Sequence, residues 1–114
     1  MNQPSVANAG PGFVVLYRWR LRTGMEAQFV QAWSSVSRKL LEQRGSLGSR
    51  LHRGQDGIWY SYAQWPSAVV RESSAALPPV DPEARRLMRE AVEQELPEVV
   101  LEPVSDFLVL PGDA

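Results

Sequence analysis

Cysteine is absent from this 114-residue chain, and histidine occurs only once, as His52. Without cysteine the chain has no disulfide, thiolate metal site or cysteine nucleophile, and its composition fits a reducing cytoplasm, which is where we expect it. A single histidine with no acidic residues at ligand spacing offers no pattern for a metal site. The sequence therefore predicts neither a metal centre nor a disulfide framework.

Long apolar runs and an excess of charge of either sign are missing as well. No stretch approaches the roughly 20 apolar residues of a membrane-spanning helix. Lysine and arginine number 12 against 13 aspartates and glutamates, a net charge of -1, so binding to nucleic acid or to anionic lipid is not favoured. Nucleotide-binding loops and nucleophile elbows are also absent. We expect a soluble protein with neither a nucleic-acid nor a membrane partner.

The chain is long enough for one domain with a real core, but not for two. Residues 1–12 are polar and contain glycine and proline, without a basic start or an apolar core segment. They are expected to form a disordered lead-in rather than a signal peptide. The folded domain is expected over residues 13–110, followed by a short tail over 111–114.

Alternating side chains over residues 58–65 predict the strand around which the rest of the chain is organised. Its two faces carry, respectively, Trp59, Ser61, Ala63 and Trp65, and Ile58, Tyr60, Tyr62 and Gln64. The turn residues 54–57 predict an antiparallel hairpin with residues 46–53. A similar alternation over 13–21 predicts a further strand, on which Arg18 and Arg20 emerge from the core.

Helix signals occupy the intervening segments. Capping-box spacing at residues 23–26 predicts a helix over 25–43, with Phe29 and Trp33 in its apolar stripe. A short helix is expected over 67–76.

A later helix should begin at Asp81, with Pro82 as its first residue, and continue to about residue 96. The last strand is expected within residues 99–110, most securely over 104–110, beyond the interruption at Pro103.

This order of elements is that of a ferredoxin-like split βαβ fold of the α+β class: an antiparallel four-stranded sheet with helices on one face. The aromatic side chains on the other face then need a cover. A second copy of the chain, packed sheet against sheet, supplies it, so we expect a two-fold homodimer.

The chain resembles the antibiotic biosynthesis monooxygenase (ABM) family of the dimeric α/β-barrel superfamily. The residues that carry the resemblance are Tyr62–Trp65, Asp56–Gly57 and Leu87–Ala91, and it extends over roughly residues 13–110. It implies a dimeric α/β barrel and an oxidation of phenolic polyketides or quinols by dioxygen, with neither metal nor flavin. The implied partners are a small aromatic molecule and O2, and no cofactor is expected.

The resemblance also implies site residues. Trp65 matches the family's pocket tryptophan, and Arg89 matches a helix arginine that suits an anionic ring oxygen. The chain departs from the family at Ser61, where such members carry asparagine, and at Arg71, where they carry tyrosine. His52 is a candidate base because its ordinary pKa lies near neutrality. Four further residues are predicted to contact the substrate: Phe29, Trp33, Trp59 and Arg71.

Structural roles are open to the same residues, since a strand tryptophan is commonly core and Arg89 can pair with Glu93 one helical turn away. The leading hypothesis is a cofactor-independent monooxygenase acting on a small aromatic, phenolic or quinol-type substrate. The alternative is a non-catalytic dimeric module that binds a small molecule or serves as an accessory protein on the same scaffold. The departures at Ser61 and Arg71 favour that alternative. Haem is not expected either, because haem-degrading relatives of the fold that this resemblance implies use a helix histidine as axial ligand, and no predicted helix here carries one.

Overall fold

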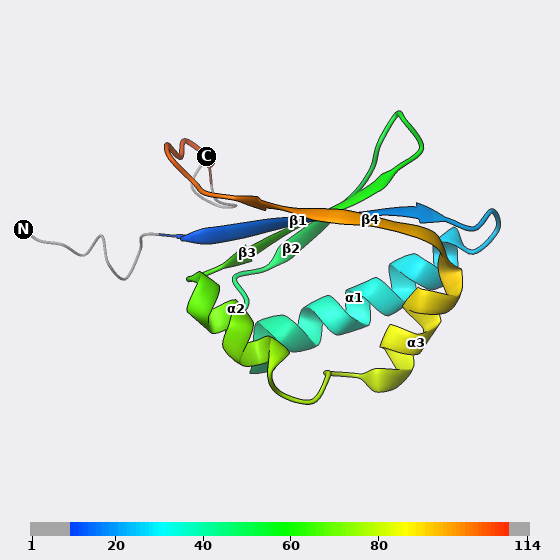
Figure 1. Cartoon of the computed structure of the whole chain (residues 1–114), viewed down its shortest axis with the longest axis horizontal. Helices are drawn as coiled ribbons and strands as arrows, with labels where there is room; N and C mark the ends of the chain where they lie inside the picture. The colour runs from blue at the N-terminus through cyan, green and yellow to red at the C-terminus, as the bar shows by residue number, and fades with distance from the viewer. Residues whose placement is uncertain (1–9, 110–114) are drawn as a thin grey trace, which may run out of the picture.

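A computed structural model describes residues 10–109 and consists of a four-stranded antiparallel sheet with three helices on one face (Figure 1). The elements in chain order are β1 (Phe13–Leu21), α1 (Glu26–Gln43), β2 (Ser49–Arg53), β3 (Trp59–Trp65), α2 (Ala68–Ala75), α3 (Pro82–Ala91) and β4 (Val92–Leu101). The sheet order is β2-β3-β1-β4. The predicted ferredoxin-like α+β fold is therefore confirmed. Most of the expected lead-in and all of the expected tail lie outside the described residues.

The alternation predicted for the third strand is also confirmed. In β3, the four residues that face the helices are buried, whereas Tyr60, Tyr62 and Gln64 are partly exposed on the outer face. β1 has the bounds expected for it, and its outer face runs from buried Val14 to exposed Arg20. The strand period of two thus fixes which side chains point toward the helices.

The first helix, α1, packs its apolar stripe on the sheet and buries Phe29 against Trp19 and Trp59. Its predicted capping box forms only in part. The Glu26 carboxylate accepts a hydrogen bond from the Gly24 amide at 3.0 Å, but the residue at the N-cap forms no side-chain cap. At the other end, Gly45 has a φ of 80°, a left-handed conformation that suits glycine.

The boundary between α3 and β4 differs from the prediction. The helix ends at Ala91 rather than near residue 96, and the last strand is Val92–Leu101 rather than 104–110. Residues 102–109 contain no helix or strand, and Leu110 lies outside the described part of the chain. The spacing of Val92 and Leu96 suits a helix, but the segment pairs with β1 instead. This antiparallel pairing satisfies the backbone N–H and C=O groups of both strands.

Pro97 is tolerated within β4 because this strand lies at the edge of the sheet. The register of β1 and β4 shifts between Leu16 and Arg18. There, the Arg18 guanidinium donates two hydrogen bonds, at 2.8 and 3.1 Å, to the carbonyl of Pro97. No helix among residues 10–109 has the length and apolar character needed to cross a membrane.

Candidate functional site

A cavity of about 420 Å³ lies between the helix-facing side of the sheet and helices α1 and α3. Its walls come from six elements, because β1, β2, β3 and β4 form the floor and the two helices form the roof. Its aromatic and charged lining residues are Tyr17, Trp19, Trp33, Trp65, Arg85, Arg89 and Glu95, and Ser61 lies among them. The site is thus a mainly apolar hollow with a few polar groups, the usual character of a small-molecule site.

Aromatic rings form much of this wall. Tyr17 and Trp19 stack with their ring centroids 6.0 Å apart and their planes 14° from parallel. Trp33, on α1, donates its indole N–H to the hydroxyl of Ser61 at 3.1 Å. Ser61 is almost fully buried, and its own O–H proton remains available to donate because its oxygen acts here as the acceptor.

Two nitrogen atoms in the cavity wall are buried without a hydrogen-bond partner. They are Nε1 of Trp65 and Nε of Arg85, and neither has an acceptor among residues 10–109. Buried polar groups are nearly always satisfied. Because both residues line the cavity, a bound ligand or water can supply the missing acceptor.

Arg85 forms no ion pair in the described part of the chain. Burial lowers the pKa of its guanidinium below the ordinary value, and the positive charges of Arg44 and Arg89 act in the same direction, against an opposing contribution from Tyr17. Arg85 was not among the residues predicted from the sequence. The available signal was its spacing from Arg89, since residues four apart share one helix face.

The cavity brings together four of the predicted site residues: Ser61, Trp65, Arg89 and Trp33. Two others lie beside it rather than in its wall. Phe29 is fully buried in the core, edge-on to Trp19 and Trp59. Trp59 lies under the guanidinium of Arg53, 5.0 Å from its ring centroid, in a separate shallow hollow.

His52, the candidate base, lies on β2 opposite Tyr60 and is exposed on the outer face of the sheet. It does not line the cavity, which is on the other side. Among the residues that line the cavity, Glu95 is the one carboxylate, and sequence reasoning missed it because residues 92–96 were placed on a helix.

Arg71 lies on α2 and forms part of a second cavity of about 350 Å³. Its guanidinium donates to the phenol oxygen of Tyr17 at 3.1 Å and to Glu98 at 3.0 Å. Burial raises the pKa of Tyr17, and Arg71 opposes that shift. The two cavities are neighbours, because Tyr17, Trp65 and Arg85 line both.

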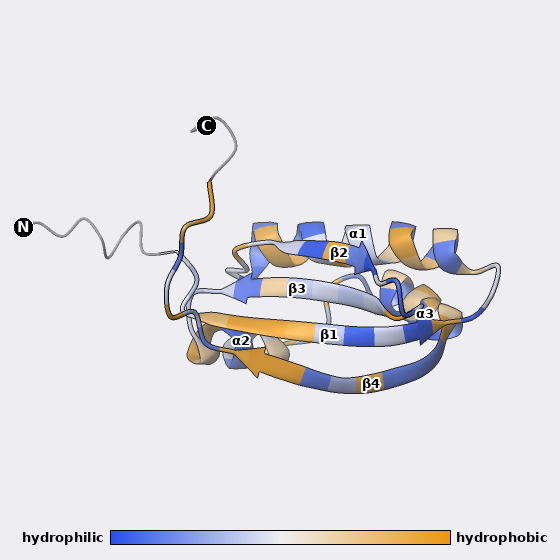
Figure 2. Ribbon diagram, turned by 90° about the horizontal axis from the view of Figure 1, so that it is seen from above, coloured by the Kyte–Doolittle hydropathy of each residue, from blue (hydrophilic) through white to orange (hydrophobic). Residues whose placement is uncertain are grey.

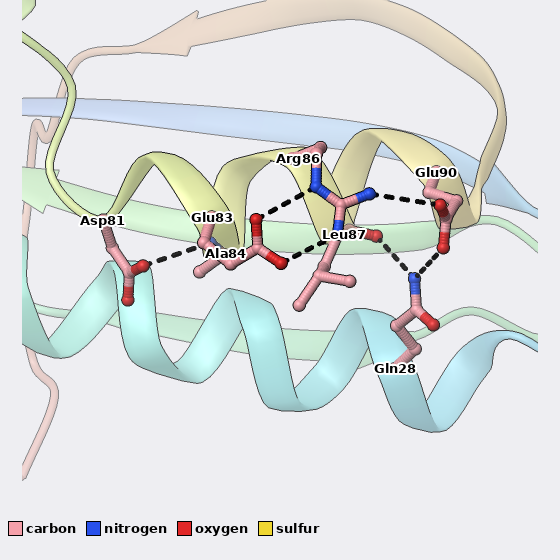
Figure 3. Close-up of polar contacts among 7 residues, drawn as sticks. All are labelled: Gln28, Asp81, Glu83, Ala84, Arg86, Leu87 and Glu90. Atoms are coloured by element: carbon pink, nitrogen blue, oxygen red, sulfur yellow. Dashed lines mark hydrogen bonds and ion pairs between the residues drawn. The ribbon is translucent and has the colours of Figure 1, made fainter.

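Polar contacts between α1 and α3 hold in place the helix that carries Arg85 and Arg89 (Figure 3). The amide of Gln28, on α1, donates to the carbonyl of Leu87 at 3.1 Å and to the carboxylate of Glu90 at 2.9 Å.

At the start of α3, the carboxylate of Asp81 accepts from the Ala84 amide, from Lys39 at 2.9 Å and from Ser35. These bonds, with that of Lys39 foremost, lower the pKa of Asp81 to about 2. Together with the Gln28 bonds, they fasten α3 to α1 and so fix the roof of the cavity.

No protein-family model matches the sequence, and no curated protein matches it. Solved structures do. A monooxygenase from the gene ActVA-Orf6 of Streptomyces coelicolor, solved with nanaomycin D, is 19% identical with a TM-score of 0.69, over 88% of this chain and 94% of that one. The cofactor-independent oxygenase SnoaB of Streptomyces nogalater is 16% identical with a TM-score of 0.65, over 87% and 96%. A Bordetella bronchiseptica protein, provisionally named an antibiotic biosynthesis monooxygenase, is 17% identical with a TM-score of 0.70, over 82% and 97%.

The chain has the fold of the antibiotic biosynthesis monooxygenases. At these identities the likeness establishes the ABM fold and leaves the chemistry to be argued from the site. The resemblance found in the sequence is thereby confirmed for the fold.

Proposed function

We propose that the protein is a cytoplasmic, cofactor-independent monooxygenase that uses O2 to oxidise a small aromatic molecule of the phenol or quinol type. The observation that carries the proposal is the pair of buried, unpartnered donors of Trp65 and Arg85 in an aromatic cavity. Donors of this kind suit an oxygen atom on an aromatic ring. Two proteins of the same fold are described as a monooxygenase and as a cofactor-independent oxygenase.

The proposed reaction balances without an external reductant. A quinol and one O2 give a hydroxyquinone and one water. One oxygen atom forms a new bond to a ring carbon, and the other leaves as water after the O–O bond breaks. All four electrons that reduce O2 come from the substrate, two from the quinol hydroxyls and two from the ring C–H bond.

Each polar residue of the cavity has a role in this proposal. Arg85 and Arg89 stabilise the oxyanion form of the substrate, which is the electron-rich form that reacts with O2, through charge-assisted hydrogen bonds. Trp65 forms the aromatic wall and donates its indole N–H, and Ser61 adds a hydroxyl donor. Glu95 is our candidate for the group that accepts the substrate proton.

We further propose that the protein works as a homodimer. No helix of residues 10–109 covers the outer face of the sheet, and the first half of β1 and the end of β4 are apolar and adjacent there (Figure 2). Val99 and Leu101 of that face are exposed. The residues after β4 add further exposed apolar side chains, namely Val104, Phe107, Leu108 and Val109. A two-fold, sheet-to-sheet contact would remove this surface from water.

A non-catalytic binding module is the second candidate, and one observation favours it. At the two positions where the chain departs from the family, the side chains are engaged within the protein. Ser61 accepts the indole hydrogen bond of Trp33, and Arg71 bonds Tyr17 and Glu98. Such a module would bind the same aromatic ligand without consuming oxygen.

Oxygen uptake separates the two candidates. Purified, chelator-treated protein is offered a panel of quinols and anthrones, and uptake is compared with autoxidation. A monooxygenase gives uptake above autoxidation, and Trp65→Phe, which keeps the wall but removes the donor, lowers it by about tenfold or more. Arg86→Gln, on the outer side of the same helix, is the matched control and keeps the wild-type rate. Tight ligand binding without uptake supports the binding module instead.

A further inference from the structure

The second cavity has a composition that the proposed reaction does not use. It adjoins the aromatic cavity along a shared wall that includes Tyr17, Trp65 and Arg85, and it is also lined by Arg44 and Arg71. No acidic side chain is among its lining residues. A half-buried hollow with three guanidinium groups and no lining carboxylate is suited to an anion.

The positive charges around this cavity are only partly neutralised. Arg71 is paired with Glu98 at 3.0 Å. Arg44 donates to the backbone carbonyls of Ser74 and Pro78, which uses two of its five N–H groups and leaves its charge without a carboxylate in the part of the chain that the structure describes.

Arg85 has no carboxylate within ion-pair distance among residues 10–109, and its Nε has no acceptor. Burying such a charge is costly unless a counter-charge arrives. Burial lowers the pKa of Arg85, and the positive charges of Arg44 and Arg89 contribute less in the same direction.

We propose that the second cavity is a subsite for a carboxylate substituent of the aromatic ligand, and that Arg85, at the boundary of the two cavities, selects acidic aromatic molecules. The inference rests on the proposed function, because it extends the aromatic site described above. The planar fork of a guanidinium matches a carboxylate in a two-point contact.

Charge also determines which cavity receives the carboxylate. The aromatic cavity contains Glu95 beside two guanidinium groups, whereas the second cavity is lined by three guanidinium groups and by no acid. The ring system therefore occupies the aromatic cavity, and its acidic substituent extends past Arg85 toward Arg44.

A matched pair of ligands tests the subsite. The full-length protein is titrated without oxygen with 1-hydroxy-2-naphthoate and with the neutral 1-hydroxy-2-naphthamide, and binding is followed by tryptophan fluorescence. We expect the acid to bind about tenfold or more tightly than the amide. Arg85→Gln should remove this preference by weakening acid binding much more than amide binding, because the amide keeps its other contacts in the aromatic cavity. Arg86→Gln, an exposed arginine next in sequence, should keep the preference, and circular dichroism checks that both variants are folded.

Three results would overturn the subsite: equal affinity of the wild type for acid and amide, an acid preference that survives Arg85→Gln, or no binding of either ligand up to about 1 mM. The outcome is independent of the proposed reaction, because binding is measured without turnover. An acid preference without oxygen uptake would retain the subsite and remove the oxygenase. Oxidation of neutral quinols with no acid preference would do the reverse.

Discussion

Arg85 illustrates a conflict between stability and binding at the level of one side chain. Its guanidinium lies half-buried in the cavity wall. Among residues 10–109 it has no ion-pair partner, and its Nε has no hydrogen-bond acceptor. A group held in this state costs the folded protein free energy that a ligand can recover.

Replacing Arg85 with Met should therefore stabilise the protein while weakening ligand binding. We expect a gain of up to about 1 kcal/mol in the free energy of unfolding, at the low end of burial costs because the side chain is half-exposed. Urea unfolding measures it. Arg86→Met is the control, since it removes exposed ion pairs to Glu83 and Glu90 and should bring no gain. A marked loss of stability in Arg85→Met would show that this arginine has a structural role.

Asp81 gives the protein a pH-dependent contribution to stability. Its pKa is about 2 in the folded protein against an ordinary 3.8, so the folded state favours the carboxylate. The contribution is fully present above pH 3.8 and is lost as the pH falls toward 2. Asp81→Asn keeps a capping side chain but has no charge. The wild type should therefore exceed it in stability near neutrality, and the difference should shrink over this acidic window.

Urea midpoints between about pH 2 and pH 6 check the Asp81 prediction. Glu93→Gln is the control, because Glu93 is an exposed carboxylate of β4 and no hydrogen bond or ion pair of its side chain is found among residues 10–109. A difference between wild type and Asp81→Asn that stays constant across the window would contradict the assigned role of Asp81.

Sequence reasoning located some site residues better than others, and the reason is geometric. A strand has a period of two, so the alternation around Ser61 and Trp65 fixed their shared face. On a helix, Arg85 and Arg89 share one face, and spacing alone does not tell which one is more deeply buried. The same alternation in β2 could have placed His52 with Tyr60 on the outer face, away from the cavity.

At the scale of elements, the segment after α3 was the hardest to predict. Val92 and Leu96 have helical spacing, and the acidic and amide residues between them are tolerated in helices. Their strand conformation depends on hydrogen bonds to β1, some seventy residues earlier in the chain. The local sequence pattern does not indicate pairing with a strand so distant in the chain. The β2–β3 hairpin could be predicted because its turn and strand signals are local.

The β2–β3 loop depends on Gly54 for a close approach of its two sides. A methyl group there would lie 2.7 Å from Cε1 of Tyr60 and 2.9 Å from the carbonyl oxygen of Ile58, and would also meet the Asp56 carboxylate. Gly54→Ala should destabilise the protein by about 1–3 kcal/mol, the usual cost of overpacking. Gln55→Ala, at an exposed position of the same loop, is the control for urea unfolding and should be nearly neutral. Equal midpoints for the two variants would contradict this account of the loop.

At the scale of the whole molecule, element order was enough to predict the ferredoxin-like fold, since few topologies fit it. The homodimer is a separate proposal, because a single chain shows only the surface that a partner would cover. That surface includes Val99 and Leu101 of β4 beside the apolar part of β1.

A charge placed on this surface should dissociate the proposed dimer. Val99 lies opposite Leu16 on the outer face, and Val99→Glu would bury a carboxylate in the sheet-to-sheet contact. Sedimentation at tens of micromolar should give a dimer for the wild type and a monomer for Val99→Glu. Leu41→Glu, at an exposed position on α1, should remain dimeric. A monomeric wild type would contradict the proposal.

The most direct test of the central claim is the fate of labelled dioxygen. The protein is given a quinol that it consumes under ¹⁸O2, and the product mass and the hydrogen peroxide formed are measured for wild type and Trp65→Phe. The account predicts one ¹⁸O atom in each product molecule, the other in water, no peroxide, and product formation by Trp65→Phe near the autoxidation rate. Stoichiometric peroxide with an unlabelled product, or an unchanged rate in Trp65→Phe, would contradict a monooxygenase built on this cavity.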